Sequence, residues 1–204
     1  MAYQNSLFPM LPDGFVYEPE FLSKEEEGEL LRSIQALHFK PFEFHEYTAK
    51  RRIVEYGWDY DFQSRRASTG RPLPDFLLPL RGRCAAFIGA PNSMIVEAVI
   101  TEYPAGAPIG WHRDVPQFET IVGISLLGSC RMHLRSSEQI TQQRAASGPR
   151  KKTRDVFSIE LEPRSLYVLA GEARWEYQHS IAPLKSLRYS ITFRTMREMY
   201  RQAS

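Results

Sequence analysis

Cysteine is scarce in this sequence: Cys84 and Cys130 are the only two among 204 residues, and they do not form a C-x-x-C pair. This excludes a disulfide framework and gives no sign of a zinc or thiol redox motif. No apolar run approaches the roughly 20 residues that a membrane-spanning helix needs. Residues 1–14 also lack the pattern of a secretory signal. We therefore expect a monomeric cytoplasmic protein with reduced thiols in its core and no membrane partner.

Net charge is also low, at +2, which argues against histone-like binding of polyanions. The charge is nevertheless uneven along the chain, because the segment 135–154 contains six Arg or Lys residues and a single carboxylate, Glu138. Such a segment is either a solvated loop or a site for an anionic partner. Its cations are Arg135, Arg144, Arg150, Lys151, Lys152 and Arg154.

Periodicity predicts helices first and strands afterwards. Ser23 and Glu26 have the S-x-x-E form of a capping box before a helix at 24–38, and a second helix is expected over 76–88, with Pro79 near its start. Short segments rich in Val, Ile, Leu, Tyr and Phe then predict strands near 94–103, 120–127, 130–135, 155–161, 165–170 and 187–195.

This order of elements predicts an α+β, mainly β fold. We expect a double-stranded β-helix, a cupin-like jelly roll, with the N-terminal helices packed outside it. The length fits one domain over 1–204, in which residues 91–197 form the jelly-roll core and residues 1–90 form a helical extension.

Three side chains have the chemistry of a metal site. His112 and Asp114 are two residues apart, so at the end of a strand both project from the same face. Non-haem iron enzymes add a second histidine and leave adjacent coordination positions open. His179 is the candidate for that ligand. Because H-x-D is short and a lone histidine is more often structural, spacing alone leaves both interpretations open.

The last expected strand alternates strictly between polar and apolar residues. Two arginines directed into a barrel would be very unfavourable unless an anion or a buried carboxylate paired with them. They could hold the two ends of a short dicarboxylate, whereas an edge strand would leave them in solvent. Arg188, Ser190, Thr192 and Arg194 share one face, and Tyr189, Ile191 and Phe193 share the other.

Thr101 and Tyr103 share one face of the strand that precedes the metal motif. Their hydroxyl groups either complete the same anion pocket or belong to ordinary core packing.

The motifs T-x-Y, W-H-R-D, Q-H-S and R-Y-S-I-T-F-R, in this order, resemble those of AlkB-family demethylases. The similarity extends from about Arg51 to Arg197 and includes the run 123–126 as well as 51–62, which resembles the nucleotide-recognition lid of the family. The resemblance implies Fe(II) bound by His112, Asp114 and His179. It also implies 2-oxoglutarate held by Tyr103, Arg188 and Arg194, with Ser190 and Thr101 where many members have Asn.

The resemblance further implies a reaction: oxidative demethylation of N-alkylated nucleobases in single-stranded DNA or RNA. In that reaction 2-oxoglutarate is decarboxylated to succinate, dioxygen is consumed and formaldehyde is released. Trp58, Tyr56 and Arg52 are then the expected substrate-binding residues of the lid. Alternation at 56, 58, 60 and 62 equally describes a β-strand with a packed aromatic face.

The substrate is the open part of this interpretation. Some DNA-repair members of the family read the methylated base with a carboxylate at the position where this chain has Pro116. The alternative function is therefore an Fe(II)/2-oxoglutarate hydroxylase of a protein or small molecule on the same jelly roll. A cupin-like binding module without redox metal would not need the paired arginines.

Overall fold

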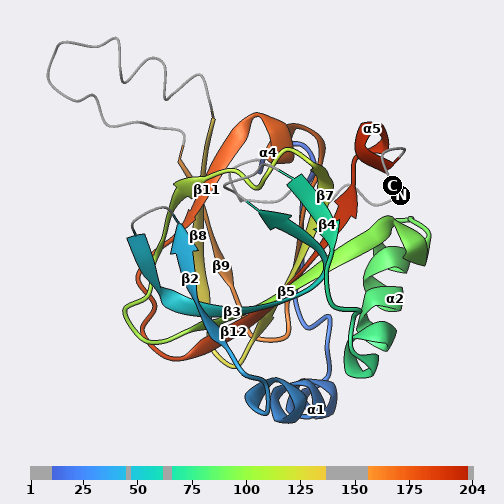
Figure 1. Cartoon of the computed structure of the whole chain (residues 1–204). Helices are drawn as coiled ribbons and strands as arrows, with labels where there is room; N and C mark the ends of the chain where they lie inside the picture. Colours follow the sequence, from blue (N-terminus) through green and yellow to red (C-terminus); the bar gives the residue numbers. More distant parts are fainter. Residues whose placement is uncertain (1–10, 45–46, 62–65, 137–155, 202–204) are drawn as a thin grey trace, which may run out of the picture.

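The computed structural model describes residues 11–44, 47–61, 66–136 and 156–201. Strands dominate it and form two sheets (Figure 1). The larger sheet contains Phe15–Glu18 (β1), Lys40–Phe44 (β2), Tyr47–Asp61 (β3), Arg66–Thr69 (β4), Ile95–Tyr103 (β5), Phe118–Leu126 (β7), Leu166–Leu169 (β10) and Arg188–Met196 (β12). The smaller sheet contains Ile109–His112 (β6), Cys130–Ser136 (β8), Phe157–Leu161 (β9) and Tyr177–Ile181 (β11).

Both sheets are antiparallel. The larger one has the order β1-β10-β7-β12-β5-β3-β2, with β4 paired to β3, and the smaller one has the order β6-β11-β8-β9. Strands that are neighbours in space are mostly distant in sequence, as in a jelly roll. The predicted fold class is therefore confirmed.

The six strands expected in the C-terminal half are confirmed as β5, β7, β8, β9, β10 and β12. The sequence analysis did not predict β11, whose segment contains Gln178, His179 and Ser180 and is extended because it pairs with β6 on one side and β8 on the other. The first 90 residues are not only helical, because β1 pairs with β10 and β3 pairs with β5 in the larger sheet.

Two helices cover the outside of the larger sheet. Helix α1 (Lys24–Gln35) begins with the predicted capping box between Ser23 and Glu26, and α2 (Leu78–Phe87) has Pro79 in its first turn. Their buried residues pack with Ile191 and Phe193 of β12 in one apolar cluster, which we call the helix-side core. The shorter helical segments are Asp75–Leu77 (η1), Asn92–Met94 (η2), Gly171–Trp175 (α4) and Glu198–Arg201 (α5).

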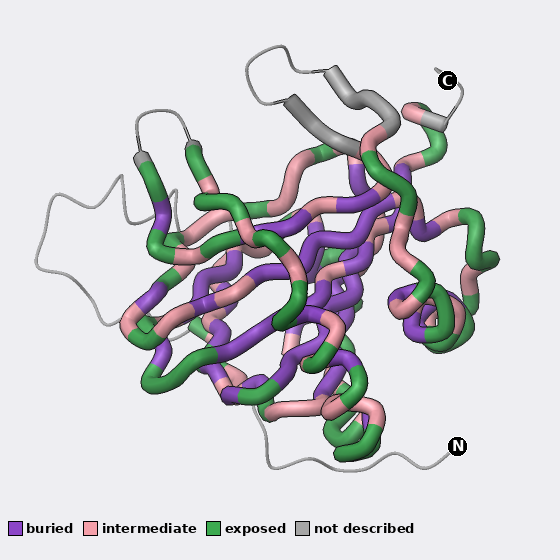
Figure 2. The backbone as a smooth tube through the Cα atoms, turned by 60° about the horizontal axis from the view of Figure 1, so that its bottom comes forward, coloured by how far each residue is buried: buried purple, intermediate pink, exposed green. Residues whose placement is uncertain are grey.

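A second cluster, which we call the barrel core, fills the space between the two sheets. It contains Tyr103, Phe118, Leu134, Tyr167 and Ile181 among others. Buried residues run along the central strands of the larger sheet in Figure 2. Cys84 lies in the helix-side core and Cys130 in the barrel core, and both are free thiols. Burial raises the pKa of Cys84 to about 12, which makes it unreactive in the folded protein.

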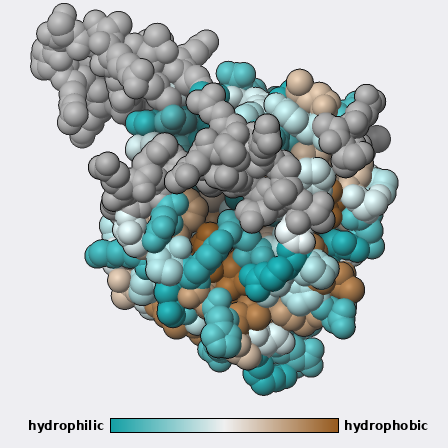
Figure 3. All heavy atoms as spheres, viewed as in Figure 1, coloured by the Kyte–Doolittle hydropathy of each residue, from teal (hydrophilic) through white to brown (hydrophobic). Residues whose placement is uncertain are grey.

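The surface agrees with this layering. In the view of Figure 3, hydrophobic side chains show in the middle of the face and hydrophilic side chains surround them.

Among the helices that the structure describes, none has the length and apolar character needed to cross a membrane.

Gly57 marks the point where β3 leaves the larger sheet. Its φ is +87°, and a Cβ there would lie 2.0 Å from the carbonyl oxygen of Val96. Gly57 is the last residue of β3 that pairs with β5, and Trp58 is the first that pairs with β4. Tyr56 consequently packs in the helix-side core, whereas Trp58 packs against the barrel core. The prediction that period-two alternation places Tyr56 and Trp58 on one face is wrong, because the alternation breaks at this glycine.

We expect Gly57→Ala to lower the free energy of unfolding by about 2 kcal/mol or more. A left-handed backbone costs an ordinary residue roughly 1–2 kcal/mol, and the clash with the Val96 carbonyl adds to that cost. Urea unfolding measures the effect. Gly28→Ala is the matched control, because Gly28 lies within α1, a Cβ there would make an ordinary 3.7 Å contact with Arg32 Nη1, and alanine should stabilise by about 1 kcal/mol. Equal destabilisation by both variants would contradict the assigned backbone strain.

Candidate metal centre and co-substrate pocket

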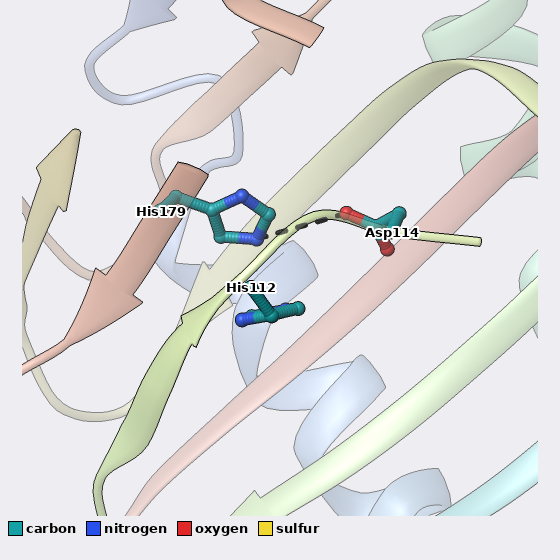
Figure 4. A group of neighbouring side chains, drawn as sticks. All are labelled: His112, Asp114 and His179. Atoms are coloured by element: carbon teal, nitrogen blue, oxygen red, sulfur yellow. Dashed lines mark ion pairs between the residues drawn. The ribbon is translucent and has the colours of Figure 1, made fainter. Parts of the chain in front are cut away.

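Three potential metal ligands converge where β6 and β11 meet (Figure 4). His112 ends β6 and pairs in register with His179 of β11, and Asp114 follows two residues later. One ligand atom from each residue lies within 4.8 Å of the others, and His179 Nε2 is 3.6 Å from Asp114 Oδ2. Two imidazoles and one carboxylate form the donor set of a facial iron site. The structure thus brings together the three residues that the sequence analysis singled out.

The backbone fixes the tautomer of His112. Its Nδ1 lies 2.9 Å from the carbonyl oxygen of Gly110. A carbonyl only accepts hydrogen bonds, so Nδ1 carries the proton and Nε2 keeps a lone pair for a metal. In metal sites generally, the ring nitrogen of a histidine ligand that does not bind the metal donates such a hydrogen bond, and this bond orients the ring.

The charges of the site favour the protonation states that bind a metal. Burial lowers the pKa of His179 to about 3, and His112 adds to that effect, so His179 is neutral at ordinary pH. Burial opposes ionisation of Asp114, but Arg194 and the histidines outweigh it and hold the pKa of this carboxyl well below its usual range. A neutral imidazole and an ionised carboxylate are the forms that ligate metals.

Arg194 holds Asp114 in place. Its Nη2 donates to Asp114 Oδ1 over 2.7 Å and its Nε donates to the same oxygen over 3.1 Å. Its Nη1 forms an ion pair with Glu97, which faces it across the pairing of β5 with β12. One partly buried arginine is therefore shared by two carboxylates. This geometry makes Arg194 a positioning residue for the metal ligand, and contact of Arg194 with 2-oxoglutarate remains a prediction.

Arg174 of α4 holds the backbone that follows Asp114. Its Nη2 donates to the carbonyl oxygens of Asp114, Val115 and Phe118, over 3.2, 2.8 and 3.0 Å. The sequence analysis missed both Arg174 and Glu97. A signal for Glu97 was present, since period-two alternation in the segment 95–103 places it on the same face as Thr101 and Tyr103.

The predicted co-substrate residues lie together inside the barrel. Arg188 is 1% exposed, its Nε donates to Ser125 Oγ over 2.9 Å, and it lies over the ring of Tyr103. Ser190 pairs in register with Thr101 and with Ser125, which continues the polar face. Arg188 Nη1 is buried and has no hydrogen-bond partner among the described residues. A buried unpaired cationic donor is unfavourable, so this interior fits a bound carboxylate.

The predicted substrate residues are divided between two faces. Trp58 is partly exposed and packs against the barrel core together with Val115. Tyr56 lies in the helix-side core. Arg52 is exposed and pairs with Glu102, whose other oxygen accepts a hydrogen bond from Tyr189, a residue of the helix-side core. Tyr56 and Arg52 therefore lie on the opposite side of the larger sheet from the barrel core.

The basic segment 135–154 is mostly outside the described residues. Within the described part, Arg135 lies over the ring of Trp111 at 4.3 Å and donates two hydrogen bonds to Gln178. The remaining cations of the segment, including Lys151, Lys152 and Arg154, lie beyond what the structure describes.

Comparison with known proteins shows the family. The model of the 2OG-Fe(II) oxygenase superfamily matches residues 14–194. The Alkylated DNA repair protein ALKBH8 homolog of Arabidopsis thaliana is 30% identical over 181 residues, which cover 82% of this chain and 50% of that protein. The Alpha-ketoglutarate-dependent dioxygenase alkB homolog 7, mitochondrial, of Mus musculus is 30% identical over 177 residues, covering 84% of this chain and 68% of that protein.

Solved structures agree on the fold. OsALKBH1 superimposes with a TM-score of 0.65 and 15% identity, over 92% of this chain and 99% of that one. The chain spans about half the length of its Arabidopsis relative. Members of the matched family use Fe(II) and 2-oxoglutarate, and the His112, Asp114 and His179 donor set together with the unpaired Arg188 Nη1 fits both. The chain belongs to the 2OG-Fe(II) oxygenase superfamily and, within it, to the AlkB-like dioxygenases.

Proposed function

We propose that this chain is an oxidative demethylase of N-alkylated nucleobases in single-stranded DNA or RNA. The position of Trp58 is the observation that carries the proposal. The β3–β4 pairing presents this partly exposed indole to the barrel core, against which Val115, the residue that follows the metal ligand Asp114, also packs. A partly exposed indole offers a stacking face to an unstacked base. The name of the Arabidopsis relative, which refers to repair of alkylated DNA, supports this substrate class.

The residues of the site would have separate roles in such a reaction. His112, Asp114 and His179 would hold Fe(II), and Arg188 and Tyr103, flanked by Ser190 and Thr101, would hold 2-oxoglutarate. When bound, these groups with dioxygen supply the oxidation of the methyl group. Arg194 and Arg174 keep Asp114 and its loop in position. The barrel core excludes water from the interior.

The preference for single strands follows from access. A base inside a duplex must be unstacked at a cost of a few kcal/mol before it reaches a buried centre. A single strand avoids that cost. Lys50, exposed near the start of β3, would provide a cation for a flanking phosphate. With Tyr56 and Arg52 on the helix side of the sheet, stacking by this lid depends on Trp58.

We expect Trp58→Ala to reduce kcat/KM for a methylated single-stranded oligonucleotide by about 10- to 100-fold. Loss of base stacking costs roughly 1–3 kcal/mol. Formaldehyde release measures turnover, and succinate formed without oligonucleotide should be unchanged, because Trp58 is not among the residues proposed to hold 2-oxoglutarate. Phe87→Ala is the control, since Phe87 is an exposed aromatic residue at the end of α2.

A panel of N-methylated single-stranded and double-stranded DNA and RNA oligonucleotides tests the substrate class. Stimulation of succinate formation with matching formaldehyde release supports demethylation. If no oligonucleotide stimulates turnover at any salt concentration, hydroxylation of a protein or small molecule replaces the proposed function.

A further inference from the structure

Tyr167 of β10 lies inside the barrel, and Gly123 makes room for it. The two residues pair in register between β10 and β7. A Cβ on Gly123 would lie 2.1 Å from Cε1, 2.2 Å from Cζ and 2.5 Å from the hydroxyl oxygen of Tyr167. The ring therefore extends across β7 at this glycine. On its other side Gly123 pairs with Thr192 of β12, in the middle of the polar face that runs from Arg188 to Arg194.

Residues of the proposed site are among the groups that shift the pKa of the Tyr167 hydroxyl. Burial raises its pKa well above the ordinary value, Tyr103 and Asp114 add to the rise, and Arg188 opposes it. The Tyr167 hydroxyl therefore lies within electrostatic reach of Tyr103, Arg188 and Asp114. At neutral pH it is a protonated phenol, which can donate a hydrogen bond.

One donor in this interior is buried and has no partner in the described part of the chain. Arg188 Nη1 is buried and unpaired. Tyr103 and Tyr167 pack in the same barrel core and are 4% and 7% exposed. Buried polar groups are normally satisfied. An unpaired guanidinium nitrogen, with two phenols close enough to interact electrostatically with it or with each other, fits a bound carboxylate.

We propose that Tyr167 is a specificity residue of the co-substrate pocket: its hydroxyl donates to a carboxylate shared with Arg188 and Tyr103, and its ring limits the length of the dicarboxylate that fits. This inference rests on the proposed function, because it takes 2-oxoglutarate as the ligand. Ordinary core packing of Tyr167 predicts a different result, since a packed ring loses nothing when its hydroxyl is removed.

The ring of Tyr167 limits the length of the dicarboxylate that the pocket accepts. The ring of Tyr167 fills the space above Gly123, and protein interiors are close-packed. A dicarboxylate with one more methylene, 2-oxoadipate, needs space that Tyr167 occupies. Leucine at this position removes the outer part of the ring and the hydroxyl together.

Direct binding to the full-length, Mn(II)-loaded protein tests the inference without turnover. Isothermal titration calorimetry gives the Kd of 2-oxoglutarate and of 2-oxoadipate for the wild type, Tyr167→Phe and Tyr167→Leu. A hydrogen bond to a charged group contributes about 1.5 kcal/mol or more, so Tyr167→Phe should raise the Kd of 2-oxoglutarate about tenfold. Tyr167→Leu should lower the ratio of the 2-oxoadipate Kd to the 2-oxoglutarate Kd at least tenfold. Affinity for Mn(II) should not change in either variant.

Tyr17→Phe is the matched control. Tyr17 pairs with Tyr167 in register, but its hydroxyl accepts a hydrogen bond from the backbone of Glu162, so the variant should bind both diacids like the wild type. If Tyr167→Phe binds 2-oxoglutarate within twofold of the wild type, or if a folded Tyr167→Leu keeps the wild-type ratio, the inference is wrong while the proposed function stands. If the wild type itself does not bind 2-oxoglutarate, the proposed function fails and the inference fails with it.

Discussion

Replacing Asp114 with alanine is expected to reduce iron-dependent turnover to background. Asp114 supplies the only carboxylate of the candidate triad, and a facial site with three protein ligands has no spare donor. The same carboxylate accepts two hydrogen bonds from Arg194. The substitution therefore removes a metal ligand and also leaves the partly buried Arg194 with Glu97 as its remaining ion-pair partner among the described residues.

A second variant separates the loss of the metal ligand from damage to the fold. Asp114→Asn keeps the size of the side chain and an oxygen for Arg194, but its amide is a poor metal ligand. We expect it to fold like the wild type by circular dichroism and to bind Fe(II) at least 100-fold more weakly in equilibrium dialysis. Asp75→Ala, an exposed carboxylate in η1, is the control. Wild-type iron affinity in Asp114→Asn would remove Asp114 from the site.

The parts of the structure that the sequence predicted are those with a strong local signal. The alternation of β12 placed Ile191 and Phe193 opposite Arg188 correctly, because a period of two leaves no other arrangement for an extended strand. The capping box before α1 is equally local, since it joins Ser23 to a residue three positions later.

The missed features depend on contacts between distant segments. Arg174 holds the loop after Asp114 from about 60 residues away in sequence, and no periodicity reveals such a contact. Gly57 reverses the face of β3 because its backbone approaches Val96, so the alternation of the aromatic residues failed there. The sequence around Tyr167 does not distinguish it from other tyrosines in buried strands. Only the pairing of β10 with β7 places it over Gly123.

Replacing each arginine of β12 with methionine should cause a different binding defect. Arg188 Nη1 has no partner among the described residues, whereas the donors of Arg194 already contact Asp114 and Glu97. Arg188→Met should therefore weaken binding of 2-oxoglutarate, and Arg194→Met should chiefly weaken binding of Fe(II). The sequence assigned both arginines to 2-oxoglutarate, and this comparison tests that assignment residue by residue.

Arg188→Met is expected to raise the 2-oxoglutarate concentration for half-maximal turnover by on the order of 100- to 1,000-fold. Removing one partner of a buried ion pair costs about 3–5 kcal/mol, and each 1.4 kcal/mol corresponds to a factor of about ten. Titration of 2-oxoglutarate at saturating Fe(II), with succinate as the measured product, gives this value. Arg131→Met is the control, because Arg131 forms an exposed ion pair with Glu160, which contributes less than about 1 kcal/mol. Equal 2-oxoglutarate requirements in the Arg188 and Arg131 variants would show that the co-substrate binds elsewhere.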